Sequence, residues 1–262
     1  MIALITVMSL FTPCALASPA EAPVAGNAEG YNAQAQTFDG KQIVSRTEFS
    51  SVYTDEQLIA LAEAGTLIQS GPVKVTTRQA VSEDGLFVDG VVRIERTTEQ
   101  MVLEDGATVE RIAFTEITTR ASNREFTGDD TKAGIVRVYT RMDTYLISVR
   151  TGGKAYRPLM VAGKAEKLNS NVAFSSMFLK CQIFNLDEFD VNGNYLRGAV
   201  SDSRTRSIAS PSNNAWYDRY TGWINYYGGH SSTTYTLYGS ATIYYTYNGS
   251  SSNFMCQVVA PM

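Results

Sequence analysis

The sequence predicts a mainly β protein, an antiparallel β-sandwich-like sheet or pair of sheets with one short helix near residues 55–64. Short runs rich in Val, Ile and Thr predict strands, and Asp-Gly or Asn-Gly pairs between them predict tight hairpins. Alternating hydroxyl and apolar residues near the C-terminus predict a half-buried strand. Because 44% of the 262 residues are hydrophobic, the chain can bury a core, which excludes wholesale disorder.

Strands and turns are expected along most of the chain. Four early runs have the composition of strands, namely Val73 to Thr77, Val91 to Thr97, Val109 to Thr118 and Ile135 to Arg141. Turns are predicted at the Asp-Gly pairs of residues 39–40, 84–85, 89–90 and 105–106 and at the Asn-Gly pairs of residues 192–193 and 248–249. These pairs adopt the positive φ that tight hairpins require.

The helix is predicted from a capping box. Thr54 can cap its start, and Gln57, three residues later, has the spacing to return the hydrogen bond. Leu58 and Ile59 begin an apolar stripe, and Gly65 is a natural end. We expect this helix to contribute packing and not chemistry.

The strand expected from Tyr235 to Tyr247 has two distinct faces. Leu237, Ala241 and Ile243 fall on one face, and hydroxyl-bearing residues dominate the other. This pattern predicts that the strand buries one face and exposes a hydroxyl-rich face to solvent.

The start of the chain resembles an export signal. Ile2 to Leu16 is an apolar stretch interrupted only by Thr6, Ser9, Thr12 and Pro13. Its end overlaps Ala15-Leu16-Ala17, which has the small-x-small spacing that a signal peptidase recognises. The stretch is shorter than the roughly 20 residues that a bilayer span needs. We therefore expect a signal peptide of residues 1–17, a secreted or extracytoplasmic protein, and no stable transmembrane span in the mature chain. The missing basic residues before Lys41 depart from the usual signal pattern.

Residues 18–36 are rich in Ala, Pro and Gly and contain almost no large apolar side chain, which predicts a flexible leader. The rest of the chain divides by composition. Residues 37–169 form a charged β-rich region with 17 basic and 19 acidic residues. Residues 170–262 form a β region rich in Tyr, Ser, Thr and Asn, with five charges of each sign and 17 of the 28 aromatic residues. Whether these two regions are one domain or two is left open.

Two cysteines follow the expected signal peptide, Cys181 and Cys256. In an exported chain, two cysteines most simply form one disulfide. The bridge would join the apolar face of residues 179–183 to that of residues 254–258, like a staple between sheets. The alternative is two separate buried thiols.

A run of aromatic residues is the strongest candidate for a ligand-binding surface, and its members are Trp216, Tyr217, Tyr220, Trp223, Tyr226 and Tyr227. Polar residues such as Asn214, Asp218 and Arg219 are interspersed with them. Aromatic rings stack on the faces of sugars while amide, carboxylate and guanidinium groups bind hydroxyls, so this composition suits carbohydrate. The alternative is that half of the rings are core residues of two short strands separated by Thr221-Gly222.

Two other motifs give weaker evidence for a functional site. The segment from Glu188 to Asn194 resembles a calcium loop, but Ala199 stands where the bidentate Glu is needed, so a hairpin at Asn192-Gly193 is expected. His230 is the only histidine, and the sequence contains no Gly-x-Ser-x-Gly elbow of a serine hydrolase. We therefore expect His230 to be a solvated loop residue. No metal site, cofactor or catalytic residue is predicted.

These observations favour a secreted, non-catalytic binding or surface-interaction protein whose aromatic C-terminal region contacts a glycan or cell-envelope component. The formal charge of −4 argues against nucleic acid as a partner. One alternative is a carboxylate-dependent hydrolase acting on polysaccharide, with Asp187, Glu188, Asp190 or Asp218 in a cleft and at least one raised pKa. A second is a membrane-active β-protein, since residues 231–253 alternate hydroxyl and apolar side chains.

Overall fold

The computed structural model describes residues 37–50, 53–63, 69–81, 87–122, 134–229 and 236–261. All of them belong to one compact unit that runs from Ala35 to Met262. The predicted signal peptide and leader, the Asp-Gly pair at 84–85 and His230 lie outside the described residues.

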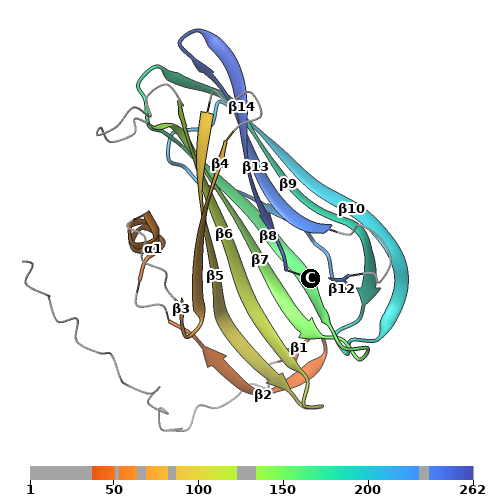
Figure 1. The fold of residues 1–262 in the computed structure, drawn as a ribbon. Helices are drawn as coiled ribbons and strands as arrows, with labels where there is room; N and C mark the ends of the chain where they lie inside the picture. The colour runs from red at the N-terminus through yellow and green to blue at the C-terminus, as the bar shows by residue number, and fades with distance from the viewer. Residues whose placement is uncertain are drawn as a thin grey trace, which may run out of the picture. The chain divides into compact units, whose positions relative to one another are not determined.

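Antiparallel strands make up nearly all of this unit, which confirms the predicted fold class (Figure 1). The charged region supplies β1 (Thr37–Phe38), β2 (Lys41–Glu48), β3 (Gln69–Ser70), β4 (Val73–Val81), β5 (Phe87–Leu103), β6 (Thr108–Ser122), β7 (Gly134–Ser148) and β8 (Lys154–Lys167). The aromatic region supplies β9 (Val172–Phe189), β10 (Tyr195–Ala209), β11 (Tyr217–Tyr220), β12 (Tyr226–Gly228), β13 (Thr236–Tyr247) and β14 (Ser250–Val259).

These strands form one hydrogen-bonded sheet in the order β1-β2-β5-β6-β7-β8-β12-β9-β13-β14. The short strand β12 pairs with both β8 and β9, so it joins the strands of the charged region to those of the aromatic region. Four strands lie off this path: β3 pairs with β4, β4 with β5, β10 with the second edge of β9, and β11 with β8. The two compositional regions therefore share one continuous sheet.

The sheet folds over itself, so that β13 and β14 pack on β6, β7 and β8. The main core lies between these two layers and includes Phe114, Met142, Leu179, Ile243 and Phe254, each buried. Burying these side chains from water is the principal stabilising contribution of the sandwich-like arrangement.

The predicted half-buried strand is confirmed as β13. Leu237, Ala241 and Ile243 are fully buried on its inner face, whereas Tyr244 on the other face is exposed. The alternation of side chains along an extended strand causes this difference.

Most predicted hairpins are present. The pairs at 39–40, 105–106, 192–193 and 248–249 each connect two neighbouring antiparallel strands. The turn predicted at Asp89-Gly90 is wrong, because both residues lie inside β5. There Gly90 is opposite Gln79 on β4 and Thr119 on β6. Hydrogen-bonding strands on both edges hold this pair extended, which local turn chemistry does not reveal.

The described residues contain one helix, α1 (Asp55–Glu63), at the predicted position. The capping box forms as expected: the Thr54 amide donates to Gln57 Oε1 at 2.9 Å, and the Gln57 amide donates to Thr54 Oγ1 at 3.3 Å. Leu58 and Ile59 are buried against Val75 and neighbouring residues on the outer face of β4 to β7. No helix in the described part of the chain has the length and apolar character needed to cross a membrane.

The predicted disulfide is wrong, because Cys181 and Cys256 are free, buried thiols. Cys181 is opposite Gly239 on one edge of β13, and Cys256 is opposite Ala241 on its other edge. One whole strand thus separates the cysteines, so their Cα atoms lie roughly 10 Å apart. A disulfide tolerates no more than about 7 Å. Both residues face the shared core, but they belong to the same layer and not to opposing ones.

Candidate functional site

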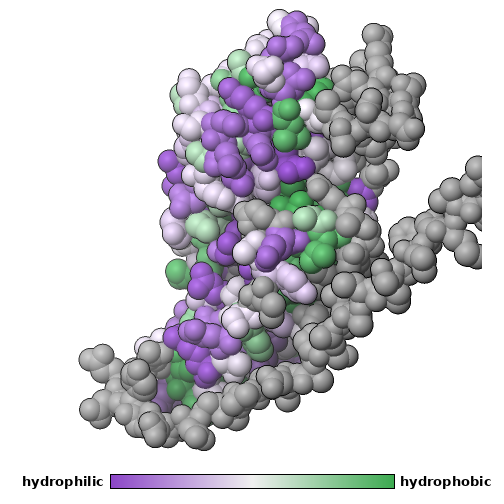
Figure 2. Space-filling model, turned by 90° about the vertical axis from the view of Figure 1, so that its left-hand side faces the viewer, coloured by the Kyte–Doolittle hydropathy of each residue, from purple (hydrophilic) through white to green (hydrophobic). Residues whose placement is uncertain are grey.

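A cleft of about 730 Å³ opens on the outer face of the sheet, opposite the main core. Its walls come from β5, β6, β7, β8 and β11, with Ile59 of α1 and Arg206 of β10 also lining it. Figure 2 views the unit from the side on which α1 lies in Figure 1 and shows polar and apolar residues interspersed there. The volume lies within the range typical of small-ligand sites, roughly 300–1,000 Å³.

The pleat of β7 and β8 determines which side chains reach the cleft. Tyr139, Arg141 and Asp143 alternate with the buried core residues Val138 and Met142. Across the ladder, these three outward residues pair with Lys164, Ala162 and Met160 of β8, which also line the cleft. Two adjacent strands thus present one row of side chains on a rigid support.

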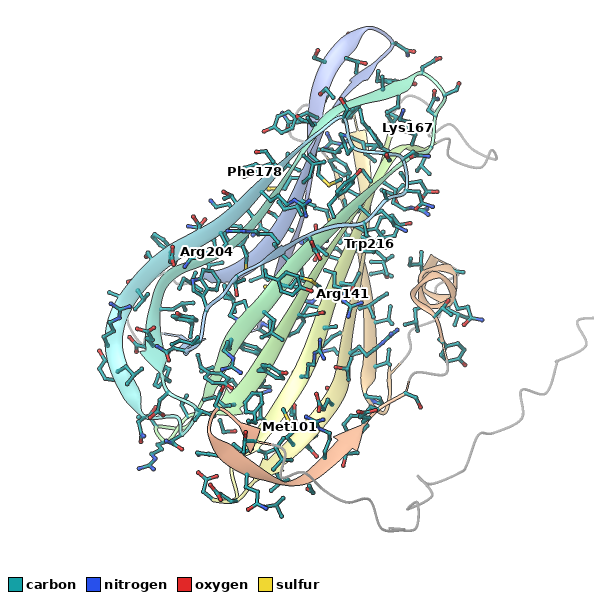
Figure 3. The ribbon with its side chains drawn as sticks, turned by 180° about the vertical axis from the view of Figure 1, so that it is seen from behind. Met101, Arg141, Lys167, Phe178, Arg204 and Trp216 are labelled. Atoms are coloured by element: carbon teal, nitrogen blue, oxygen red, sulfur yellow. The ribbon has the colours of Figure 1, made fainter. Side chains whose placement is uncertain are left out.

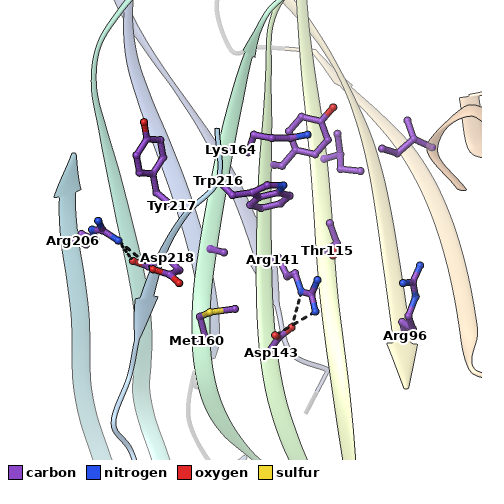
Figure 4. A pocket seen from close by; sticks show the side chains of 14 residues that line it. Arg96, Thr115, Arg141, Asp143, Met160, Lys164, Arg206, Trp216, Tyr217 and Asp218 are labelled. Atoms are coloured by element: carbon purple, nitrogen blue, oxygen red, sulfur yellow. Dashed lines mark hydrogen bonds and ion pairs between the residues drawn. The ribbon is translucent and has the colours of Figure 1, made fainter. Parts of the chain in front are cut away.

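Aromatic rings and a lysine form one end of the cleft. Trp216 and Tyr139 meet edge to face, with ring centroids 6.0 Å apart. Lys164 Nζ lies 4.0 Å from the centroid of the Tyr139 ring and 5.4 Å from that of Trp216. Figure 4 shows the Lys164 side chain beside the indole of Trp216. Such placements are favourable, because the face of an aromatic ring is negative.

Two ion pairs form the remaining polar wall. Arg141 donates to Asp143 through Nε at 2.8 Å and Nη2 at 3.3 Å. Arg206 Nη1 donates to the Asp218 side chain at 3.2 Å and to its carbonyl oxygen at 2.6 Å. Figure 4 draws both pairs at the edge of the space in front of Trp216. Planar guanidinium and carboxylate groups hold several hydrogen-bonding atoms in fixed geometry.

The six residues of the predicted aromatic run differ in their exposure to solvent. Trp216 is 47% exposed and lines the cleft together with Tyr217, which is half-buried. Figure 3 shows Trp216 beside Arg141 on this face of the sheet. Tyr220 is 66% exposed, but it does not line the cleft.

The other three aromatic residues, Trp223, Tyr226 and Tyr227, are buried, so they are not available for the predicted ligand contact. Trp223 Nε1 donates to Asp202 Oδ2 at 2.9 Å, and its ring meets Tyr227 edge to face at 5.8 Å. Tyr226 and Tyr227 lie on β12, which is enclosed between β8 and β9. For these three residues the alternative, a core position, is correct.

The acidic residues before the β9–β10 turn are held by hydrogen bonds. Glu188 accepts from Asn225 Nδ2 at 2.9 Å, Tyr227 Oη at 3.3 Å and Arg197 Nε at 2.5 Å. Burial works to raise the pKa of Glu188, but the hydrogen bonds from Asn225 and Arg197 outweigh it, so the pKa is lowered. The carboxylate therefore stays ionised and lacks the raised pKa expected of a general acid.

Asp190 has a structural role in the same turn. Its carboxylate accepts from the amides of Asn192 and Asn194 at 2.8 and 2.9 Å, in the hairpin predicted there. Burial works to raise its pKa, but the hydrogen bonds from Asn194 and Asn192 outweigh it, and the pKa is lowered. Within the described ranges, no group of three or more His, Cys, Asp or Glu side chains is placed to hold a metal ion.

Sequence reasoning missed the β7 and β8 side of the cleft. The signal was available: Arg137, Tyr139, Arg141 and Asp143 follow a period of two within a run otherwise rich in Val and Ile. Such alternation places the polar residues on one face of a strand. The sequence pattern could not show that Trp216 lies next to these residues, because that depends on the pairing of β11 with β8.

A scan against protein-family models, a search of curated proteins and a search of solved structures each found no match for this chain.

Proposed function

We propose that this chain is a non-catalytic binding protein that takes a carbohydrate or another cell-envelope component in the cleft between α1 and β11. The observation that carries the proposal is the half-exposed indole of Trp216 on the wall of that cleft, beside the ring of Tyr139. Apolar ring surface next to fixed polar groups is the combination that polar, flat-faced ligands require.

The polar wall supports the same ligand class. Asp143 and Asp218 are each paired with an arginine, so both carboxylates are oriented acceptors and both guanidinium groups are oriented donors. Sugar hydroxyls both donate and accept, and they match such a surface. This arrangement suits hydrogen bonding to a ligand more than it suits proton transfer.

Location outside the cytoplasm belongs to the same proposal. The apolar stretch from Ile2 to Leu16 and the following Ala15-Leu16-Ala17 motif predict export, which would bring the cleft into contact with envelope or extracellular polysaccharides. The N-terminal sequence of protein recovered outside the cytoplasm tests this part, and we expect it to begin at Ser18.

Binding of the purified chain to a panel of oligosaccharides and envelope polysaccharides tests the ligand class. Trp216→Ala should weaken binding at least tenfold, because it removes the stacking surface. Tyr220→Ala is the matched control, since this exposed ring of the same run does not line the cleft. Binding by none of the panel, or equal binding by wild type and Trp216→Ala, would overturn the proposal.

A further inference from the structure

Lys164 occupies an unusual position for a lysine. The residue is 8% exposed, and its side chain lies on the outer face of β8 against Tyr139 and Trp216. In the part of the chain that the structure describes, its ammonium group contacts these two rings and forms no ion pair with a carboxylate. A buried charge without a counterion is costly, and aromatic rings offset only part of that cost.

The nearest acidic residue on this strand is already engaged. Glu166 lies two positions from Lys164 on the same face of β8, but its carboxylate accepts from Tyr139 Oη at 3.1 Å. Arg137 lies 3.9 Å from the same Glu166 oxygen. Tyr139 thus presents its ring face to Lys164 and its hydroxyl to Glu166, which keeps the lysine and the glutamate apart.

The lining of the cleft as a whole is positively charged. It contains four cationic side chains, those of Arg96, Arg141, Lys164 and Arg206, and two carboxylates, those of Asp143 and Asp218. The chain has a formal charge of −4, so the cleft has the opposite sign to the molecule. A local excess of one sign in a concave site concentrates ligands of the other sign.

We infer that the ligand of this cleft is an acidic saccharide, and that Lys164 binds its anionic oxygen group while Trp216 stacks on the sugar ring. The inference rests on the proposed function and specifies its ligand. The chemistry that Lys164 recognises is shared by sugar carboxylates and sugar sulfates, because both present charged oxygen acceptors to an ammonium donor.

Calorimetric titration of the full chain with two matched pairs of probes tests the inference. Oligogalacturonate is compared with its methyl ester, and dextran sulfate is compared with dextran. We expect the acidic member of at least one pair to bind tenfold or more tightly than its neutral partner, and the pair that shows this identifies carboxylate or sulfate as the group. The preference should decrease as salt is added, since the contact is electrostatic.

Variants of Lys164 then separate charge from packing. Lys164→Met keeps an unbranched apolar chain and should abolish the tenfold preference for the acidic probe over its neutral partner. Lys164→Arg should retain a preference for the acidic probe. Lys167→Met is the control, because Lys167, labelled in Figure 3, is an exposed lysine of the same strand outside the cleft. Its ammonium group lies over the ring of Phe174.

The outcomes distinguish the inference from the proposed function. Trp216-dependent binding with no preference for either acidic probe, or a preference that survives Lys164→Met, overturns the inference and leaves the proposed function standing. Failure of all four probes and of the wider saccharide panel removes the proposed function, and the inference falls with it.

Discussion

Asp39 Oδ2 lies 2.6 Å from Nη1 of Arg157, although 118 residues separate them in the sequence. The guanidinium of Arg157 is buried between the rings of Phe38, Tyr145 and Tyr226, and Nη1 also donates to the carbonyl oxygen of Ile224 at 3.0 Å. The first described hairpin of the chain therefore supplies the counterion for a charge on the central strand β8.

Replacing Asp39 by Asn should destabilise the fold, because the turn conformation is retained while the buried guanidinium loses its anionic partner. We expect a loss of about 1–3 kcal/mol in the free energy of unfolding, measured by urea titration. Asp105→Asn is the matched control, since Asp105 occupies a second Asp-Gly turn and pairs with Lys41 at the surface. Exposed pairs contribute little. Equal losses in the two variants would contradict the role assigned to Asp39.

The two tryptophans should behave differently on replacement by alanine. Trp223→Ala should cost about 3–5 kcal/mol in unfolding free energy, because it empties a packed site and removes the indole N–H that donates to Asp202. Trp216→Ala should cost about 1 kcal/mol or less, since its ring is half exposed. Chemical denaturation measures both. A larger loss for Trp216→Ala would mean that its ring supports the fold and not a ligand.

The two buried thiols should make the protein sensitive to alkaline pH. Burial raises the pKa of Cys181 and of Cys256 from 9.0 to about 12. As the pH rises above about 9, the unfolded thiols ionise first, so the unfolded state binds fewer protons and stability falls. Their contribution is complete below pH 9 and decreases up to about pH 12, by about 1.4 kcal/mol per pH unit for each thiol.

Unfolding free energies at pH 8 to 11 measure this effect in a Cys14→Ala background, which removes the third cysteine of the sequence. In Cys181→Ala the alkaline decrease should be smaller by the share of one thiol, because every other ionisable group is common to both proteins. A thiol reagent should modify neither cysteine before unfolding. Identical pH profiles, or a disulfide in the folded protein, would refute the assignment.

Thr140 connects the two layers of the sheet through its buried hydroxyl. Oγ1 donates to the carbonyl oxygen of Cys256 at 2.8 Å and accepts from the amide of Ala241 at 3.1 Å. Thr140→Val keeps the shape but removes both of these buried hydrogen bonds, so we expect a loss of about 1–3 kcal/mol in unfolding free energy. Thr205→Val on exposed β10 should change it by about 0.5 kcal/mol or less. No difference between the variants would count against this link.

Alanine substitutions at two turn glycines distinguish the cost of backbone strain from the cost of a steric clash. Gly193 and Gly249 have φ values of 69° and 81°, so alanine is strained at both, by about 1 kcal/mol. A Cβ on Gly193 would also lie 2.9 Å from Ser148 O and from Val149 Cα, whereas a Cβ on Gly249 would meet nothing within 4 Å. Gly193→Ala should therefore cost about 1–3 kcal/mol more than Gly249→Ala in thermal or urea unfolding. Equal losses of unfolding free energy in the two variants would show that the β9–β10 turn shifts to accommodate the added methyl group.

The sequence by itself determined the features that depend on a few neighbouring residues. The capping box at Thr54 and Gln57, four Asp-Gly or Asn-Gly hairpins and the inner face of β13 all follow from local hydrogen bonding or from a period of two. The same local reasoning failed at Asp89-Gly90, where partner strands on both edges override the turn preference.

Tertiary structure alone decided which distant residues meet. Cys181 and Cys256 share a core, yet their separation depends on β13 lying between their strands, and no spacing in the sequence encodes that. Likewise, the aromatic run divides because β12 is enclosed by β8 and β9 while Trp216 lies over β8, beside Lys164. Strand order and register arise from the packing of the whole sheet, so a local pattern can show that a side chain faces outward but not what it faces.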